Sequence, residues 1–193
     1  MSDIKTVLDE TPFQTAGPFL HIGCLPNAIN IEGVFDNDLG VKPFSNKHND
    51  KFITITGSVF DGDGKALDDI MLESWQSDEN GVYSPECGFA RFVPDSLTKK
   101  FNLYTLKPGF MNNIDGKAQS PHILLSISSR GLNMTLNTRI YFEGDDLTSD
   151  PLLSIVRNSR NDVSSLVAKK IDEDIFLFDI FLQGDKETIF LDI

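Results

Sequence analysis

Metal binding is the first chemistry to consider, because histidine side chains are the commonest protein ligands for transition metals. The three histidines of this chain are His21, His48 and His122, and none lies within metal-ligand spacing of another. A single neutral imidazole does not make a metal centre, since protein metal sites use three or four protein ligands. The histidines by themselves therefore favour surface or core residues over a metal centre.

Other common reactive sites also lack support. Asp61-Gly62-Asp63-Gly64 begins like a calcium loop, but an EF-hand needs Gly at its sixth position and Glu at its twelfth, where this chain has Ala66 and Leu72. Serines follow His122 closely, yet no Gly-x-Ser-x-Gly elbow is present. No glycine-rich phosphate loop is found either. The sequence thus argues against a calcium sensor, a serine hydrolase and a nucleotide-binding enzyme.

Arg130 is the residue whose position most suggests a binding role. It ends a predicted strand and precedes Gly131, whose conformational freedom allows a tight turn that would place the guanidinium on a rim. One interpretation is a solvated loop arginine. The other is contact with an anion or a carboxylate, which the planar fork of a guanidinium suits. The residues alone leave both open.

Composition bounds the class of protein. The chain has 193 residues, 40% of them hydrophobic, which is enough to bury the core of one domain. Its formal net charge of -12 argues against nucleic acid or an anionic membrane as a partner. Cys24 and Cys87 are predicted to be reduced thiols. No signal peptide and no apolar run of roughly 20 residues is present, so we expect a cytoplasmic location.

Short strands separated by turns dominate from residue 51 onward. A helix capped by Asp150 is predicted to begin at Pro151 and to run through Val156, and residues 164–170 are a second candidate helix. Many strands with few helices predict a mainly β protein, an antiparallel two-sheet β-sandwich. The predicted strands are 52–60, 70–75, 101–106, 123–128, 134–142, 175–182 and 188–191, the last two joined as a hairpin.

Residues 1–50 form a predicted N-terminal arm before a domain that spans residues 51–193. Regular elements in the arm are broken by Pro12, Gly17, Pro18, Gly23, Pro26 and Pro43, yet the segment is too apolar for a solvated tail. We expect the apolar side chains of an extended arm to pack against another surface. Its own domain and a partner chain are equally good candidates.

Several segments, in order over nearly the whole chain, resemble the intradiol ring-cleaving dioxygenases. In the catalytic chains of that family, Lys-Pro-Gly precedes a Tyr ligand, and Pro-x-His-x-His supplies two His ligands. The matching segments are Glu10–Gly23, Gly57–Gly62, Glu73–Asp78, Asn80–Tyr83, Lys107–Gly109, Pro121–Ile123, Arg130–Asn133, Phe178–Gly184 and Glu187–Asp192.

The resemblance also shows which ligands are missing. Met111 stands at the Tyr position, Leu124 stands at the second His position, and only His122 remains. The segment Tyr83–Arg91 is shorter than the family pattern, so the region of the first Tyr ligand does not align. The resemblance therefore implies a chain that binds no iron. It is most similar to the α subunit of heteromeric members, whose catalytic β subunit holds Fe(III) with two Tyr and two His.

The same resemblance implies a reaction and a contribution to it. The assembled enzyme would cleave protocatechuate with O₂ to 3-carboxy-cis,cis-muconate, while this chain would complete the pocket and the assembly. Gly17 and Pro18 match arm residues that reach the β active site, and Arg130 matches an arginine near the pocket mouth. Two alternatives stay open: a self-sufficient dioxygenase with atypical ligands, and a non-enzymatic β-sandwich binding module.

Overall fold

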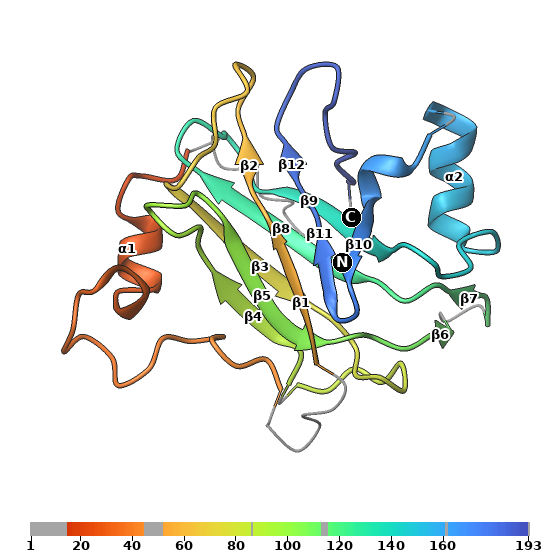
Figure 1. Ribbon diagram of the computed structural model, residues 1–193, viewed down its shortest axis with the longest axis horizontal. Coiled ribbons are helices and arrows are strands. Elements are labelled where there is room, and N and C mark those ends of the chain that lie inside the picture. Colours follow the sequence, from red (N-terminus) through yellow and green to blue (C-terminus); the bar gives the residue numbers. More distant parts are fainter. Residues whose placement is uncertain (1–14, 45–51, 86, 113–115, 161, 193) are drawn as a thin grey trace, which may run out of the picture.

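A computed structural model describes residues 15–44, 52–85, 87–112, 116–160 and 162–192. The first part of the predicted arm and His48 lie outside these ranges. Figure 1 shows one large curved sheet with a helix at each side. The strands of this sheet, in spatial order, are β4 (Phe89–Phe92), β3 (Ile70–Trp75), β8 (Ile123–Ser129), β9 (Leu136–Phe142), β10 (Val167–Asp172), β11 (Ile175–Leu177), β1 (Phe52–Gly57) and β5 (Phe101–Leu106).

Two small ribbons accompany the large sheet. The first pairs β2 (Val59–Phe60) with β12 (Ile180–Phe181), and the second pairs β6 (Met111–Asn112) with β7 (Ala118–Gln119). The mainly β character and the scarcity of helix are confirmed. An antiparallel two-sheet sandwich is not, because β1–β11, β9–β10 and β2–β12 pair in parallel and the eight strands are continuous. The long crossover between β9 and β10 carries a helix, which allows the parallel pairing.

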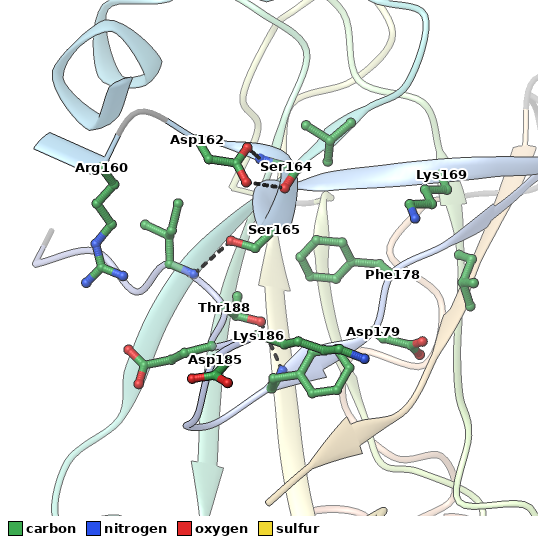
Figure 2. A pocket seen from close by; sticks show the side chains of 15 residues that line it. Arg160, Asp162, Ser164, Ser165, Lys169, Phe178, Asp179, Asp185, Lys186 and Thr188 are labelled. Carbon is green, nitrogen blue, oxygen red and sulfur yellow. Dashed lines mark hydrogen bonds between the residues drawn. The ribbon is translucent and has the colours of Figure 1, made fainter. Parts of the chain in front are cut away.

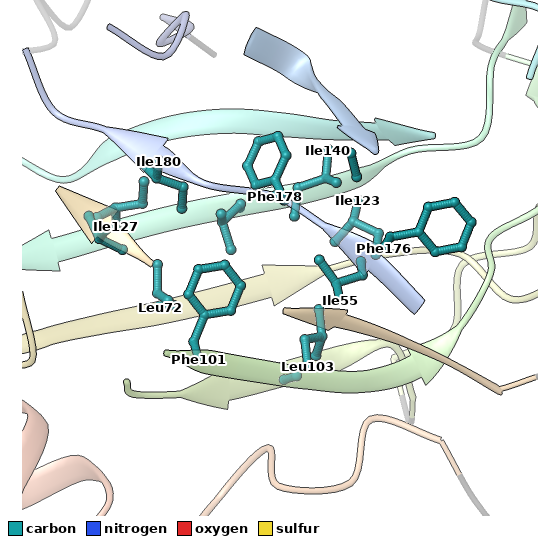
Figure 3. Close-up of a cluster of buried hydrophobic side chains, with 14 of the residues drawn as sticks. Ile55, Leu72, Phe101, Leu103, Ile123, Ile127, Ile140, Phe176, Phe178 and Ile180 are labelled. Atoms are coloured by element: carbon teal, nitrogen blue, oxygen red, sulfur yellow. The ribbon is translucent and has the colours of Figure 1, made fainter. Parts of the chain in front are cut away.

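The hydrophobic core lies inside the curve of the sheet. Alternate residues of β8 are fully buried, as its strand periodicity predicts. The two edge strands approach each other, since the rings of Phe92 in β4 and Phe101 in β5 are 5.6 Å apart. The sheet therefore curls almost into a barrel around one apolar cluster (Figure 3), whose labelled members are Ile55, Leu72, Phe101, Leu103, Ile123, Ile127, Ile140, Phe176, Phe178 and Ile180.

Helix α2 (Pro151–Arg160) covers the outer face of the sheet at β9. Its Leu153 packs with the fully buried Tyr141 in a second cluster. The predicted Asp150 cap is confirmed: its Oδ1 accepts hydrogen bonds from the backbone N–H groups of Leu152 and Leu153 at 2.9 and 3.0 Å. None of the helices in the described ranges has the length and apolar character that a bilayer crossing requires.

Two predicted elements near the C-terminus are wrong. Residues 164–170 form a short 3₁₀ turn, η3 (Ser164–Leu166), and then strand β10, because pairing of Val167 with Tyr141 outweighs the local helix preference. Residues 188–191 form no strand. The N–H of Thr188 donates to Phe181 O and the N–H of Leu191 to Asn137 O, which are single bonds and not a ladder.

The described part of the arm is not purely extended, contrary to expectation. It contains helix α1 (Leu20–Cys24) and the 3₁₀ turn η1 (Asn27–Ile29), which Asp38 caps through both carboxylate oxygens. The following segment packs on the sheet domain: Phe44 joins Phe52 and Leu106 in a small buried cluster. Local hydrogen bonds thus shape the arm even where prolines interrupt regular structure.

Candidate functional site

Strands β8 and β9 bring four residues of interest onto the outer face of the sheet. Leu124 lies directly opposite Arg139 in the strand register. One pair further along, the rings of His122 and Tyr141 are 5.7 Å apart. Because side chains alternate along a strand, these four residues share one face, while Ile123 and Ile140 point into the core.

The third predicted position, Met111, reaches the same neighbourhood through a turn. Met111 in β6 pairs with Gln119 in β7. The turn that precedes Met111 is hydrogen-bonded to the turn that begins at Asp78, since the N–H of Gly109 donates to Asp78 O at 2.9 Å. A Cβ on Gly81, whose φ is 78°, would lie 1.9 Å from Phe110 O, so only glycine fits this contact.

Aromatic side chains form the opposite wall. Trp75 in β3 pairs with Leu124 across the strands, and its ring stacks on Tyr83 at 6.0 Å between centroids. Asn80–Tyr83 directly follows Asp78, which is hydrogen-bonded to Gly109, and this turn places Tyr83 beside Trp75. Trp75, Leu124 and Arg139 also line an open cavity of about 420 Å³ over β3, β8 and β9.

Arg139 lies where these positions meet. Its Nη1 donates to Gln119 Oε1 at 3.1 Å and to Tyr141 Oη at 3.3 Å. Its Nε is buried and has no hydrogen-bond partner among the described residues. Sequence reasoning placed Arg139 in a strand without assigning it a role. A charged residue inside a predicted strand, directly before Ile140, Tyr141 and Phe142, was the signal that could have marked it.

Asp150 connects this group to helix α2. It is fully buried, and its Oδ2 accepts a hydrogen bond from the N–H of Ser120 at 3.0 Å. Its Oδ1, besides capping α2, accepts a hydrogen bond from Tyr141 Oη at 3.4 Å. A chain of hydrogen bonds therefore runs from the Arg139 guanidinium through Tyr141 to the helix N-terminus, where the helix dipole favours a carboxylate.

Burial and the nearby guanidinium control the protonation of the site. Burial, and secondarily the charge of Arg139, lower the pKa of His122 to about 4. Burial raises the pKa of Tyr141 to about 12, with Arg139 opposing. His122 is 3% exposed, and its Nδ1 lies 2.8 Å from Ser120 O. Because a carbonyl oxygen can only accept, Nδ1 carries the proton and donates it to this bond. Both side chains are thus neutral near pH 7.

These residues do not fit a ferric ion. The described ranges contain no cluster of three or more His, Cys, Asp or Glu side chains placed to hold a metal. Leu124 offers no ligand atom, and the Met111 thioether is a soft ligand that suits ferric iron poorly. Of the three family ligand positions, only His122 would offer a suitable ligand atom, and the nearby guanidinium of Arg139 repels cations. No reaction step through iron follows from this chain's own residues.

Arg130 and the arm form a second group at the other end of β8. Gly131 has a φ of 92°, so the predicted tight turn is present, and its N–H donates to Thr15 Oγ1 at 2.7 Å. This bond places the start of the described arm beside Arg130. The Arg130 side chain is 64% exposed, and its guanidinium pairs with Asp69 at 2.8 Å, a partner that the sequence did not indicate.

The structure keeps the two groups apart. His122 and Arg130 flank the two ends of β8, which separates them by roughly 25 Å at the rise of a strand. Gly17 and Pro18 lie with Arg130 at the arm end, while Met111, His122 and Leu124 lie with Arg139 at the other. Arg130 therefore cannot serve a reaction centred on His122 in the same chain.

A second cavity, of about 620 Å³, lies elsewhere and contains none of these residues. Figure 2 shows it between η3, β10 and the returning C-terminal segment. Some of its polar groups are used locally, as where the N–H of Ile189 donates to Ser165 Oγ at 3.2 Å. Its charges are of both signs and indicate no single ligand class; they belong to Arg160, Lys169, Lys186, Asp162, Asp179, Asp185 and Glu187.

Comparison with known proteins gives a consistent result. The profile of a family described as "Dioxygenase" matches residues 27–184. The chain is 34% identical over 198 residues to the protocatechuate 3,4-dioxygenase alpha chain of Pseudomonas putida, covering 96% of this chain and 98% of that one. It is 30% identical to the Burkholderia cepacia protein of the same name, covering 97% and 100% of the two chains.

Solved structures share the fold at lower identity. The dioxygenase domain of a dioxygenase carbohydrate-binding fusion protein from Streptomyces sp. SirexAA-E has a TM-score of 0.57 at 20% identity, covering 91% of this chain and 99% of that one. Catechol 1,2-dioxygenase from Acinetobacter sp. ADP1 also has a TM-score of 0.57, at 18% identity, covering 84% and 67% of the two chains. Their likeness concerns the arrangement of the strands.

Proposed function

Because the chain belongs to the intradiol dioxygenase family, we propose that it is the non-catalytic α subunit of a heteromeric protocatechuate 3,4-dioxygenase. The observation that carries this proposal is similarity over essentially the whole chain to proteins named as alpha chains. The absence of ligand atoms at Leu124 and of a phenolate at Met111 supports it. The chain would then need a partner that supplies the metal.

In this proposal the partner β subunit holds Fe(III), which binds protocatechuate and enables its cleavage by O₂ to 3-carboxy-cis,cis-muconate. This chain contributes the wall of the partner's pocket and the assembly. The cytoplasm is the proposed compartment, in keeping with the free thiols of Cys24 and Cys87.

Exposed apolar side chains on the arm support a partner contact. Within residues 15–44, several large apolar side chains are more than two-fifths exposed, and Phe19 in front of α1 is 73% exposed. Exposed apolar surface of this kind marks interaction sites. The others are Ile31, Val34, Phe35, Leu39 and Val41. We propose that the domain division at residue 50 reflects this use, with part of the arm lying on the sheet domain and part on the partner.

Co-expression tests the proposed function directly. The chain should co-purify with a catalytic chain that carries Tyr and Pro-x-His-x-His ligands, and only the complex should consume O₂ with protocatechuate. The chain alone should show no stoichiometric iron, no tyrosinate-to-iron absorption and self-association in size exclusion. A monomer that ignores the partner, or one iron per chain with activity, would contradict the proposal.

Arg130 is proposed to act on the partner's anionic substrate. Arg130→Ala should raise KM for protocatechuate by roughly five-fold in the complex, because an exposed charge contact is worth about 1 kcal/mol. Asp69 already neutralises part of this charge, so the effect should not be larger. Steady-state O₂ uptake measures it, with iron content and assembly unchanged.

Two controls separate charge from shape. Uncharged catechol should respond little to Arg130→Ala, since it lacks the carboxylate. Asp69→Asn removes the competing carboxylate while keeping the cation, so KM for protocatechuate should stay level or fall. Equal losses on both substrates would make Arg130 a packing residue, and no loss on either would make it a solvated loop residue.

A further inference from the structure

We propose that the guanidinium of Arg139 occupies the place of the metal cation in this chain, so that restoring the lost ligands would not restore metal binding while this charge is present. The inference rests on the proposed function only through the family's ligand positions. It concerns the chain itself and does not depend on the partner.

Geometry is the first argument. The three ligand positions lie next to Arg139 or are separated from it by one residue. Leu124 is its direct cross-strand neighbour, so the two Cβ atoms are about 5 Å apart. Met111 pairs with Gln119, which accepts a hydrogen bond from Arg139 Nη1. His122 packs on Tyr141, which accepts another from the same nitrogen. Side chains converging from these positions would meet the guanidinium.

Charge is the second argument. Within the described ranges, Arg139 forms no ion pair with a carboxylate. Asp150 reaches it only through the Tyr141 hydroxyl. The site therefore retains a positive charge on a half-buried side chain, where the lowered dielectric strengthens repulsion of a second cation. A ferric ion brought to this place would meet that repulsion whichever neutral ligands surrounded it.

The arrangement of donors also argues for a fixed cation. Gln119 Oε1 and Tyr141 Oη hold Nη1, and Tyr141 is itself held by the buried Asp150. An arginine used only for solubility would extend its charge into solvent. Here the guanidinium is instead held by hydrogen bonds beside the only remaining ligand, His122, over which its field acts.

The test compares three forms of the full-length chain that all carry Met111→Tyr and Leu124→His. The first keeps Arg139, the second adds Arg139→Lys, and the third adds Arg139→Gln. Ferric iron is supplied as its nitrilotriacetate complex. Iron per chain and the tyrosinate-to-iron absorption band are measured, and chelator competition gives the affinity. We expect the Gln form to bind iron at least ~100-fold more tightly than the other two, because only it lacks the charge.

Equal iron affinity in the three forms, including no binding in any of them, would overturn the proposal. Arg139→Met is a second neutral variant in case the Gln form does not fold, which circular dichroism reports. If both neutral variants unfold while the Lys form folds, the site requires a cation, and the proposal stands. If the Lys form unfolds as well, the shape of Arg139 is what matters, and the proposal fails. None of these outcomes bears on co-purification with a partner.

Discussion

Replacing Asp150 by alanine is expected to lower the free energy of unfolding by about 4 kcal/mol. The carboxylate is fully buried and accepts hydrogen bonds from three backbone N–H groups, of Ser120, Leu152 and Leu153, and from the Tyr141 hydroxyl. Loss of a helix cap costs about 1 kcal/mol. Each buried donor left without an acceptor adds about 1–3 kcal/mol. Urea denaturation followed by circular dichroism measures the change.

Two matched variants test the reason for this loss. Asp150→Asn keeps an oxygen for the helix cap but presents N–H groups toward Ser120 or Tyr141, so it should cost about 2 kcal/mol. Asp162→Ala removes an exposed carboxylate that caps η3 through the N–H of Ser164, and it should cost less than about 1 kcal/mol. If Asp150→Ala proves no more damaging than Asp162→Ala, the buried network does not stabilise the fold.

Local patterns predicted most of the β-structure. The predicted strands 123–128 and 134–142 correspond to β8 and β9, and in β8 every second residue is buried, because a strand with one face on the core shows a period of two. The helix cap at Asp150 could also be predicted, because it depends only on neighbouring residues. Sheet order and the parallel pairs were beyond reach, since strands far apart in sequence, such as β1 and β11, meet only through tertiary packing. The same cause turned residues 167–170 into a strand.

The residues of the candidate site were also predicted only in part. The family resemblance, not spacing alone, pointed to Met111, His122 and Leu124, and strand pairing brings each of them near Arg139, directly or through one neighbouring residue. The sequence did not predict that Arg139 lies beside these positions, because its place depends on the register between β8 and β9. The second function of Asp150 was hidden too, since Ser120 and Tyr141 reach it from different segments. Asp69 escaped notice as the partner of Arg130 for the same reason.

The stability of the chain should fall more steeply with acid than that of a His122→Gln variant. The folded-state pKa of His122 is about 4, below the ordinary value of about 6.5 that it has when unfolded. Above pH 6.5 both states are neutral at this residue. Between pH 6.5 and pH 4 the unfolded chain binds a proton that the folded chain excludes, so stability declines as pH falls. Below pH 4 both states are protonated and the decline stops.

The magnitude follows from the width of that window. Between pH 7.5 and pH 4.5 the wild-type chain should lose about 2.5 kcal/mol more than His122→Gln, which stays neutral throughout and can still donate to Ser120 O. Surface carboxylates also titrate in this range, but they are common to both chains and cancel in the difference. Tyr141, Asp150 and Arg139 are retained in both as well.

A control on the same strand face separates titration from packing. Ser126→Ala removes a hydroxyl that hydrogen bonds Asn137 at 2.7 Å but leaves His122 in place, so it should reproduce the wild-type dependence on pH. Urea denaturation at pH 7.5, 6.5, 5.5 and 4.5 provides the four free energies for each chain. Parallel curves for wild type and His122→Gln would mean that the imidazole accepts a proton in the folded state as readily as when unfolded. That result would require an open, hydrated site around Arg139 in place of the buried one described above.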